Sequence, residues 1–383
     1  MKLLNTYAKK VTAAILAIVL LCALTVSGIV IGCELSKKPP APLPPFAIPQ
    51  NVRAKNVVFM IGDGMGPNHL EATCAYYDIP SLYMEDYATA KGYATTHSAD
   101  NAVTDSAAAG TALSTGHKTN NGSIATKEGE LLQNMSEYAI TQGKVVGIVA
   151  TEAVTGATPA TFSAHATDRD DENDIIASQM QSGVSLFMGA GKGSCDLRAE
   201  SIRNRGYTYV NTDKALTDEL MSADKIFAAF SSVDPYGKDT DNNPNLAEAS
   251  LFALNYLDQK SENGFFAMIE ASHIDKRSHN KKMTDMVAEL RGFDEAIKAV
   301  VEWANEKGDT LVIVTADHET GNLTGASRTE DTIGKFQSSS HTGQNVYVFA
   351  YHPTATFMDG YTIDNTDISK IVRQYLLATP PSP

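Results

Sequence analysis

The stretch that most constrains the fold is residues 265–279, FFAMIEASHIDKRSH. It begins with an apolar run that has the length and the flanks of a buried strand. Glu270 follows at the expected end of this strand, and in open α/β sheets ligands bind at the edge formed by the carboxyl ends of the strands. Asp275 and His279 are four residues apart, so on a helix they share one face and can bind one metal ion. Such a pair suits zinc, and a carboxylate at a strand tip also suits magnesium, although Asp and His at this spacing also occur on ordinary solvated helices.

Two other predicted strands end in residues of the same kind. Residues 56–61, NVVFMI, are followed by a glycine-rich turn that leaves Asp63 at the strand tip, where it could bind a ligand or cap the next helix. A second apolar run leads to Asp317 and His318, and His341 precedes a third. Together these acids and imidazoles match the ligand preferences of a cluster of divalent ions.

The remaining patterns alternate between apolar runs of strand length and helical three-four spacings, which predicts an α/β fold. Predicted strands cover residues 144–150, 185–188, 207–210, 225–230, 311–314 and 346–350. Predicted helices cover residues 68–77, 367–377 and a long amphipathic segment from Met283 that ends near Gly308. The segment from 78 to 103 is expected to be irregular. The glycine-rich residues 189–193 are expected to form a turn, because they lack the spacing of a phosphate-binding loop.

Small residues dominate the segment VTDSAAAGTA, residues 103–112, so its backbone can pack closely against another group. Ser106 lies at the predicted start of a short helix, where free N–H groups and the helix dipole favour an anion. The alternative is that Ser106 only caps the helix. Further along, Arg169 opens the acidic run 170–172. Its guanidinium could hold two phosphate oxygens, or the run could be an ordinary solvated surface.

The formal net charge of −14 at pH 7 argues against nucleic acid or an anionic membrane surface as a general partner. The same charge would repel a phosphate ester unless bound divalent cations invert the potential locally. A chain of 383 residues can bury one large α/β core or two smaller ones. Only Cys74 and Cys195 follow the first 33 residues, so no disulfide framework is expected, and Cys74 is predicted to be a buried apolar residue.

The N-terminal segment is predicted to direct export. Two lysines precede 22 uncharged residues, so residues 1–32 are either a cleaved signal peptide or a membrane anchor. The motif VIGC, which ends at Cys33, resembles the lipobox of bacterial lipoproteins. A proline-rich tether over residues 33–50 then leads to one domain over residues 51–383. We expect a protein on the periplasmic or extracellular side, attached to the membrane by a lipid on Cys33 or by the uncleaved helix.

Taken together, the motifs strongly resemble the alkaline phosphatase family. They occur in the family's order and span residues 56–343: NVVFMIGDGMG, VTDSAAAGTALSTG, ATPATFSAH, FFAMIEASHIDKRSH, TLVIVTADHETG and SHTG. The resemblance implies a three-layer α/β/α sandwich with a central, mostly parallel sheet. It also implies hydrolysis of phosphate monoesters, with a phosphodiesterase or sulfatase of the same superfamily, or a non-catalytic lipoprotein that kept the fold, as alternatives.

Position by position, the resemblance assigns Ser106 as the nucleophile that becomes a phosphoserine and Arg169 as the residue that holds the phosphoryl group. It implies two zinc ions and one magnesium ion. The first zinc would be held by Asp63, Asp317 and His318, and the second zinc by Asp275, His279 and His341. The magnesium would be held by Thr158 and Glu270, with Asp63 bridging to it.

Two departures from the family pattern, and one feature shared with bacterial relatives only, bear on these assignments. Gly156 stands where relatives often carry Asp or His near the magnesium, which puts magnesium binding in question. Lys276 follows Asp275, as in bacterial relatives where a lysine contacts phosphate through water. Only residues 319–340 separate His318 from His341, where relatives often carry an insertion that forms a dimer interface, so a homodimer is possible but not required.

Overall fold

A computed structural model describes residues 46–211, 216–233 and 243–378. The predicted export segment 1–32, the lipidation site Cys33 and most of the tether lie outside the described residues. Within those ranges, no helix has both the length and the apolar character needed to cross a membrane. Cys74 and Cys195 are both free thiols and both buried, as expected from the absence of a disulfide framework.

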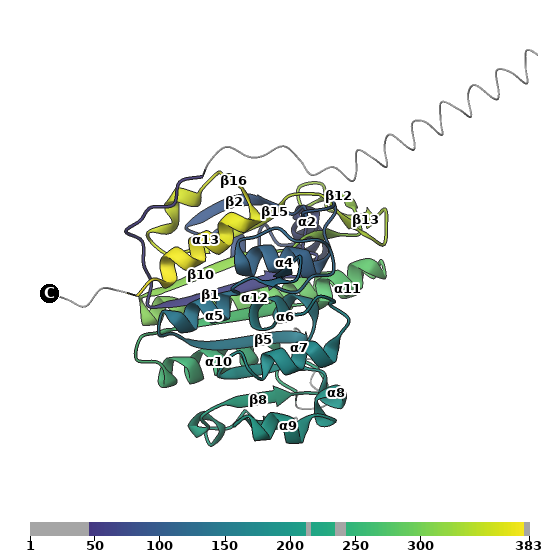
Figure 1. The fold of residues 1–383 in the computed structure, drawn as a ribbon. Helices are drawn as coiled ribbons and strands as arrows, with labels where there is room; N and C mark the ends of the chain where they lie inside the picture. Colours follow the sequence, from purple (N-terminus) through teal and green to yellow (C-terminus); the bar gives the residue numbers. More distant parts are fainter. Residues whose placement is uncertain (1–45, 212–215, 234–242, 379–383) are drawn as a thin grey trace, which may run out of the picture.

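A ten-stranded sheet runs through the middle of the molecule (Figure 1), in the order β16-β2-β15-β10-β1-β9-β5-β6-β8-β7. Only the pairings of β15 with β10 and with β2 are antiparallel, so the sheet is mostly parallel, as predicted. The strands are β1 (Asn56–Gly62), β2 (Ala90–Thr95), β5 (Val145–Ala153), β6 (Leu186–Ala190), β7 (Thr208–Val210), β8 (Ile226–Ala229), β9 (Phe265–Ala271), β10 (Thr310–Thr315), β15 (Val346–Tyr351) and β16 (Thr362–Asp364).

Helices cover both faces of this sheet, which completes the three-layer α/β/α sandwich (Figure 1). One layer contains α4 (Ser106–Thr115), α5 (Met135–Thr141), α6 (Ala157–Ser163) and α13 (Asn365–Leu376). The other contains α2 (Pro67–Tyr77), α10 (Leu246–Lys260), α11 (His273–His279) and α12 (Met283–Lys307). Shorter helices are α3 (Tyr83–Asp86), α7 (Glu172–Gln179), α8 (Lys192–Asp196) and α9 (Ala199–Asn204).

The three central strands β1, β9 and β10 are buried along their whole length. Helices cover them on both sides, which is why their sequences are continuous apolar runs instead of alternating ones. They are in parallel register, with Ile61 of β1 beside Glu270 of β9 and Thr315 of β10. The three strands therefore end at the same edge of the sheet, and the residues that follow them are brought together there.

The segment from 78 to 103, expected to be irregular, contains α3 and β2, so that prediction was wrong. The sequence of β2, AKGYAT, is short and rich in small residues, and its burial alternates because one face is only partly covered. It belongs to the sheet through its pairing with β15, a contact between residues about 250 positions apart that no local pattern reveals.

The short segment after His318 forms its own small structure. Strands β12 (Leu323–Ser327) and β13 (Thr332–Phe336) form a hairpin that packs on α2. Strand β11 (Glu319–Thr320) pairs with β14 (His341–Thr342), which places His341 next to the end of β10. A second small hairpin, β3 (Thr126–Lys127) with β4 (Glu130–Leu131), lies outside the main sheet.

Candidate active site

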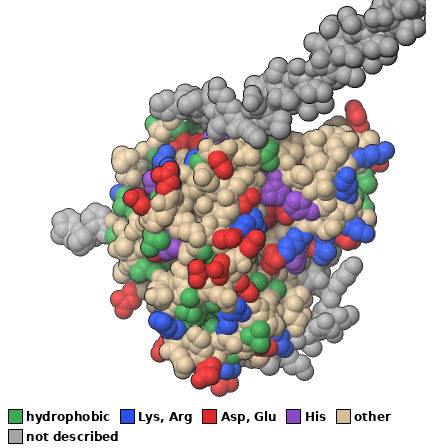
Figure 2. Space-filling model, turned by 45° about the vertical axis from the view of Figure 1, so that its right-hand side comes forward, with side chains coloured by type: hydrophobic (Ala, Val, Ile, Leu, Met, Phe, Trp, Pro, Cys, Tyr) green, Lys and Arg blue, Asp and Glu red, His purple; other side chains and the backbone are tan. Residues whose placement is uncertain are grey.

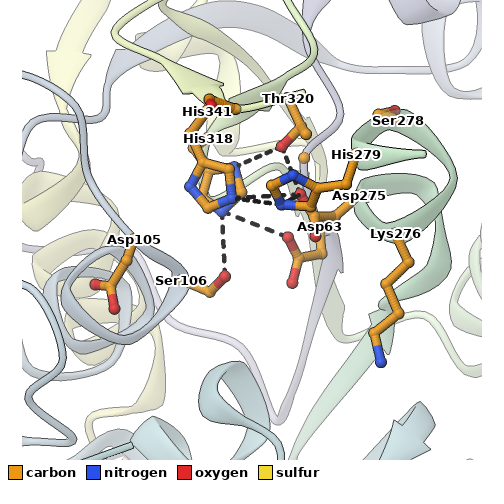
Figure 3. Close-up of polar contacts among 12 residues, drawn as sticks. Asp63, Asp105, Ser106, Asp275, Lys276, Ser278, His279, His318, Thr320 and His341 are labelled. Atoms are coloured by element: carbon orange, nitrogen blue, oxygen red, sulfur yellow. Dashed lines mark hydrogen bonds and ion pairs between the residues drawn. The ribbon is translucent and has the colours of Figure 1, made fainter. Parts of the chain in front are cut away.

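The predicted ligands come from the carboxyl edge of the sheet, and Figure 3 shows Asp63, Asp275, His279, His318 and His341 close together. Asp63 follows β1, Glu270 lies near the end of β9, and Asp317 and His318 follow β10. The turn after β1 can approach α11 closely because Gly64 has a φ of +73° and no side chain: a Cβ there would lie 2.8 Å from the Cα of Asp275. The alternative role of Asp63 as a helix cap is wrong, because Gly66 is the N-cap of α2.

The first cluster surrounds the Nε2 atom of His318. Three oxygen atoms lie near this nitrogen: Ser106 Oγ at 3.2 Å, Asp317 Oδ2 at 3.2 Å and Asp63 Oδ1 at 3.5 Å. His318 is completely buried, and Asp63 Oδ1 and Asp317 Oδ2 accept no hydrogen bond from any residue that the structure describes. One nitrogen cannot satisfy two buried carboxylates, so this arrangement fits a bound cation.

The tautomer of His318 supports the same conclusion. Thr320 Oγ1 donates its only proton to Asp275 Oδ1 at 2.5 Å. The same hydroxyl lies 3.2 Å from His318 Nδ1, so this nitrogen must be the donor in that contact. The lone pair of the neutral imidazole is then on Nε2, where it faces the carboxylates. A buried imidazole oriented in this way is a typical zinc ligand.

The second cluster contains Asp275 and two imidazoles. His279 Nε2 lies 3.2 Å from Asp275 Oδ1 and 3.1 Å from His341 Nε2, and the latter lies 3.5 Å from the same carboxylate oxygen. The Nδ1 atoms contact backbone carbonyls, His279 with Ser339 at 2.7 Å and His341 with Thr104 at 2.9 Å. Since a carbonyl only accepts, both Nδ1 atoms donate, and in the neutral imidazoles both Nε2 lone pairs face each other. A cation between them removes this repulsion, and the donor set of two imidazoles and one carboxylate fits zinc.

A third group of oxygen donors lies beside Asp63. Thr158, in the first turn of α6, places its Oγ1 3.5 Å from Asp63 Oδ2. Glu270 is 2 % exposed, and its Oε2 atom has no hydrogen-bond partner in the described parts of the chain. Hydroxyl and carboxylate oxygens without a nitrogen are the donor set that magnesium prefers. The residues present therefore fit the predicted magnesium site.

The predicted nucleophile points into the first cluster, while its neighbour Asp105 points away from it (Figure 3). Ser106 is the first residue of α4, and the N-cap is Asp105, whose side chain accepts from the backbone N–H of Ala108 at 2.9 Å. Ser106 is therefore not the cap, and its hydroxyl is free to act on another group. Arg169 donates to the other oxygen of Asp105 at 3.0 Å, which places its guanidinium beside the start of α4.

The clusters can be reached from solvent. Figure 2 shows histidine side chains at the surface of one face, with acidic and basic side chains beside them. The side chain of His279 is 37 % exposed and that of Arg169 is 33 % exposed, whereas His318 and Asp317 have no exposed side-chain surface. A phosphate group could therefore reach the partly exposed residues while the deeper ligands stay dry.

Without cations, the charge of this site is unfavourable. Burial, together with the charge of Asp317, raises the pKa of Asp63. Burial raises the pKa of Asp317 to about 7 and the pKa of Glu270 to about 8, and it lowers the pKa of His318 well below its usual range. The carboxyl groups therefore resist ionisation unless a positive charge lies nearby. The raised pKa values and the unpartnered oxygen atoms thus both point to a bound cation.

This charge predicts how the stability of the metal-free protein depends on pH. Folding raises the pKa values of Asp317 and Glu270 from about 4 to about 7 and about 8, so the folded state favours their protonated forms, and this stabilisation is lost progressively as pH rises from about 4 to about 8. The melting temperature of the protein in a chelator should therefore fall between pH 5 and pH 8 and level off above that range. Asp317→Asn and Glu270→Gln should each reduce that fall. A melting temperature that stays flat in the chelated wild type would contradict the prediction.

Three residues near the site were missed by the sequence reasoning. Thr320 fixes the tautomer of His318, and Ser272 places a buried hydroxyl oxygen without a partner among the described residues two positions after Glu270. Glu152 forms an ion pair with Lys276. In the sequence, Thr320 and Ser272 stand out only as polar residues two positions after a predicted ligand. Glu152 follows the predicted strand 144–150 by two positions, which is the same signal that singled out Asp63.

Comparison with known proteins agrees with this geometry. The sequence profile of the family described as alkaline phosphatase matches residues 54–187 and 185–335. Alkaline phosphatase 4 of Bacillus subtilis is 34 % identical over 289 residues, covering 70 % of this chain and 62 % of that protein. Alkaline phosphatase of Escherichia coli is 29 % identical, covering 82 % of this chain and 84 % of that protein.

The fold also matches solved structures. The alkaline phosphatase from the Antarctic bacterium TAB5 superposes with a TM-score of 0.76 at 28 % identity, covering 86 % of this chain and 99 % of that one. A variant of that enzyme has been solved with Mg bound in a site called M3. The match spans less than two thirds of the Bacillus subtilis protein but nearly all of the TAB5 structure. On the sequence profile and these relatives, the chain belongs to the alkaline phosphatase family.

Proposed function

We propose that this protein is a metal-dependent alkaline phosphatase that hydrolyses phosphate monoesters through a phosphoserine at Ser106. The observation that carries the proposal is the position of the Ser106 hydroxyl. Its oxygen lies 3.2 Å from His318 Nε2, the same atom that the unpartnered oxygens of Asp63 and Asp317 face. A serine beside a cation site at the start of a helix has the surroundings of an activated nucleophile.

The metal content is proposed as two zinc ions and one magnesium ion. The first zinc would be held by Asp63, Asp317 and His318, the second by Asp275, His279 and His341, and the magnesium by Asp63, Thr158 and Glu270. When bound, these cations lower the pKa of a nearby hydroxyl and offset the charge of the phosphoryl group. Ions held by these residues would also offset the net charge of −14 where an anionic substrate binds.

The chain's own residues account for the rest of the reaction. Ser106 Oγ loses its proton and attacks phosphorus, the bond between phosphorus and the ester oxygen breaks, and that oxygen takes up a proton and leaves as the alcohol, so the phosphoryl group remains on the serine. Water then attacks the phosphoserine, which restores the Ser106 hydroxyl and releases inorganic phosphate. Asp105 holds the Arg169 guanidinium through one nitrogen, so its other N–H groups can donate to the equatorial phosphoryl oxygens. Because these contacts involve the phosphoryl group alone, little selectivity for the alcohol is expected.

A comparison of three substrates tests this proposal against other reactions of the superfamily. With zinc and magnesium at alkaline pH, we expect an aryl phosphate monoester to be hydrolysed much faster than the corresponding diester or sulfate ester. Ser106 is followed by three alanines and not by the C/S-x-P-x-R setting of sulfatases. A faster diester or sulfate reaction would overturn the proposal, and zinc binding without turnover of any ester would indicate a non-catalytic lipoprotein.

We also propose that the protein is exported and remains attached to the membrane through a lipid on Cys33 or through the uncleaved segment 1–32. The support is the uncharged stretch and the VIGC motif. The mass of the mature N-terminus distinguishes the two forms.

A further inference from the structure

Gly156 has no side chain, and the carboxylate of Glu152 lies beside the space that a side chain there would fill. Gly156 is the N-cap of α6, two residues before Thr158, and contributes no side-chain hydrogen bond. A Cβ at this position would lie 3.8 Å from Glu152 Oε2. The Glu152 carboxylate, near the end of β5, therefore lies next to the space into which a side chain at 156 would project.

Sheet register places Glu152 at the same edge as the third group of oxygen donors. Strand β5 pairs with β9 so that Ala150 lies beside Glu270, and Glu152 is two residues further toward the carboxyl end. The adjacent Thr151 accepts a hydrogen bond from the backbone N–H of Ser272 at 2.9 Å. The negative charge of Glu152 is also one of the causes that raise the pKa of Glu270, after burial.

An ion pair holds the Glu152 carboxylate in this position. Its partner is Lys276, the residue directly after the predicted ligand Asp275. The two side chains are 37 % and 44 % exposed, and exposed ion pairs add little to stability. The pair therefore orients the Glu152 carboxylate beside the site more than it stabilises the fold.

Unpartnered polar atoms at the same place point to a ligand. Glu270 Oε2 and Ser272 Oγ are buried, and neither forms a hydrogen bond of good geometry with a described residue, although the Ser272 hydroxyl is close enough to the Glu270 carboxylate to lower its pKa. Magnesium keeps several of its waters when it binds to protein, and those waters donate to nearby carboxylates and hydroxyls. A hydrated cation would satisfy both atoms and would present water hydrogens toward Glu152.

We infer that Glu152 is a positioning residue for the third cation: it accepts hydrogen bonds from the cation's waters in place of the side chain that Gly156 lacks. The cation itself is held by Asp63, Thr158 and Glu270, so the inference rests on the proposed function. Its consequence is that magnesium binding in this chain depends on an acid four residues earlier in the sequence than the family pattern predicts.

Magnesium titration of the zinc-loaded full chain by calorimetry tests this role. Glu152→Gln should weaken magnesium binding by about 10–100-fold, the usual cost of losing an outer partner of a metal site. Zinc content and melting temperature should stay close to those of the wild type. Asp258→Asn, which removes the exposed ion pair with Lys307 between α10 and α12, is the matched control and should leave magnesium affinity unchanged.

A rescue variant separates this role from a structural one. Gly156 has φ −57° and ψ 158°, which an aspartate can adopt, and its Cβ would lie 3.0 Å from the carbonyl oxygen of Ala153, so a small shift is needed. Gly156→Asp should restore most of the magnesium affinity in the Glu152→Gln background.

The possible failures can be told apart. Equal magnesium affinity in Glu152→Gln and wild type, or a wild type that binds zinc but no magnesium, would overturn the inference and leave the zinc-dependent phosphatase proposal standing. A wild type that binds neither metal would overturn the proposed function and the inference with it.

Discussion

Replacing Ser106 with alanine is expected to lower the rate of phosphate monoester hydrolysis by at least about 1,000-fold. The substitution removes the oxygen that lies 3.2 Å from His318 Nε2 and leaves the cation ligands in place. Zinc content should therefore be unchanged while turnover is lost. The measurement is the steady-state rate on an aryl phosphate, together with acid-quenched trapping of radiolabelled phosphate on the protein, which should label the wild type alone.

Ser114→Ala is the matched control for this experiment, because it makes the same change on the same helix. Ser114 is buried and accepts a hydrogen bond from the backbone N–H of Met135 at 3.0 Å, so its loss should cost about 1 kcal/mol of stability. Its turnover should stay near that of the wild type. If Ser106→Ala were as active as Ser114→Ala, Ser106 would not be the nucleophile.

Asp317→Asn is expected to have the second largest effect, on zinc affinity and activity together. Asp317 Oδ1 accepts from the backbone N–H groups of Gly64 at 3.1 Å and His318 at 2.9 Å, while Oδ2 faces the cation site. An amide removes the charge that the cation requires. Since losing an outer partner of a metal site costs about 10–100-fold in affinity, losing a direct ligand should cost more. Zinc competition against a chromogenic chelator measures the change.

Asp294→Asn provides the comparison for a buried acid outside the site. Asp294 is 2 % exposed and also accepts two backbone N–H groups, those of Tyr83 and Met84, each at 2.9 Å. Its substitution should lower the melting temperature without changing zinc affinity. Equal zinc affinity in Asp317→Asn and wild type would exclude Asp317 as a ligand.

The central part of the fold could be predicted because burial on both faces leaves a strong local signal. Strands β1, β9 and β10 are continuous apolar runs, and the long spacing pattern that ends at Gly308 is helix α12. Strand β2 and the antiparallel direction of β15 could not be predicted in this way. Both depend on pairing between segments far apart in the chain, which local periodicity does not encode.

The site, too, has residues that the sequence could predict and residues that it could not. Asp63, Glu270, Asp317 and His318 were found because each lies at or near a strand end, where parallel register brings such residues together. Their assignment to particular ions came from the resemblance to the family and stays a proposal, while the tautomers and the unpartnered oxygens fit a bound cation at these residues. The role of Asp105 as the helix cap, and the pairing of Glu152 with Lys276, depend on side-chain positions that no spacing rule supplies.

We propose that acids and imidazoles from distant segments together bind divalent cations beside Ser106. Anomalous scattering at the zinc absorption edge, measured on crystals of the purified protein, tests it most directly. We predict two strong peaks, one among Asp63, Asp317 and His318 and one among Asp275, His279 and His341. Crystals grown with zinc that show no peak at either cluster, or peaks only elsewhere on the surface, would contradict the account.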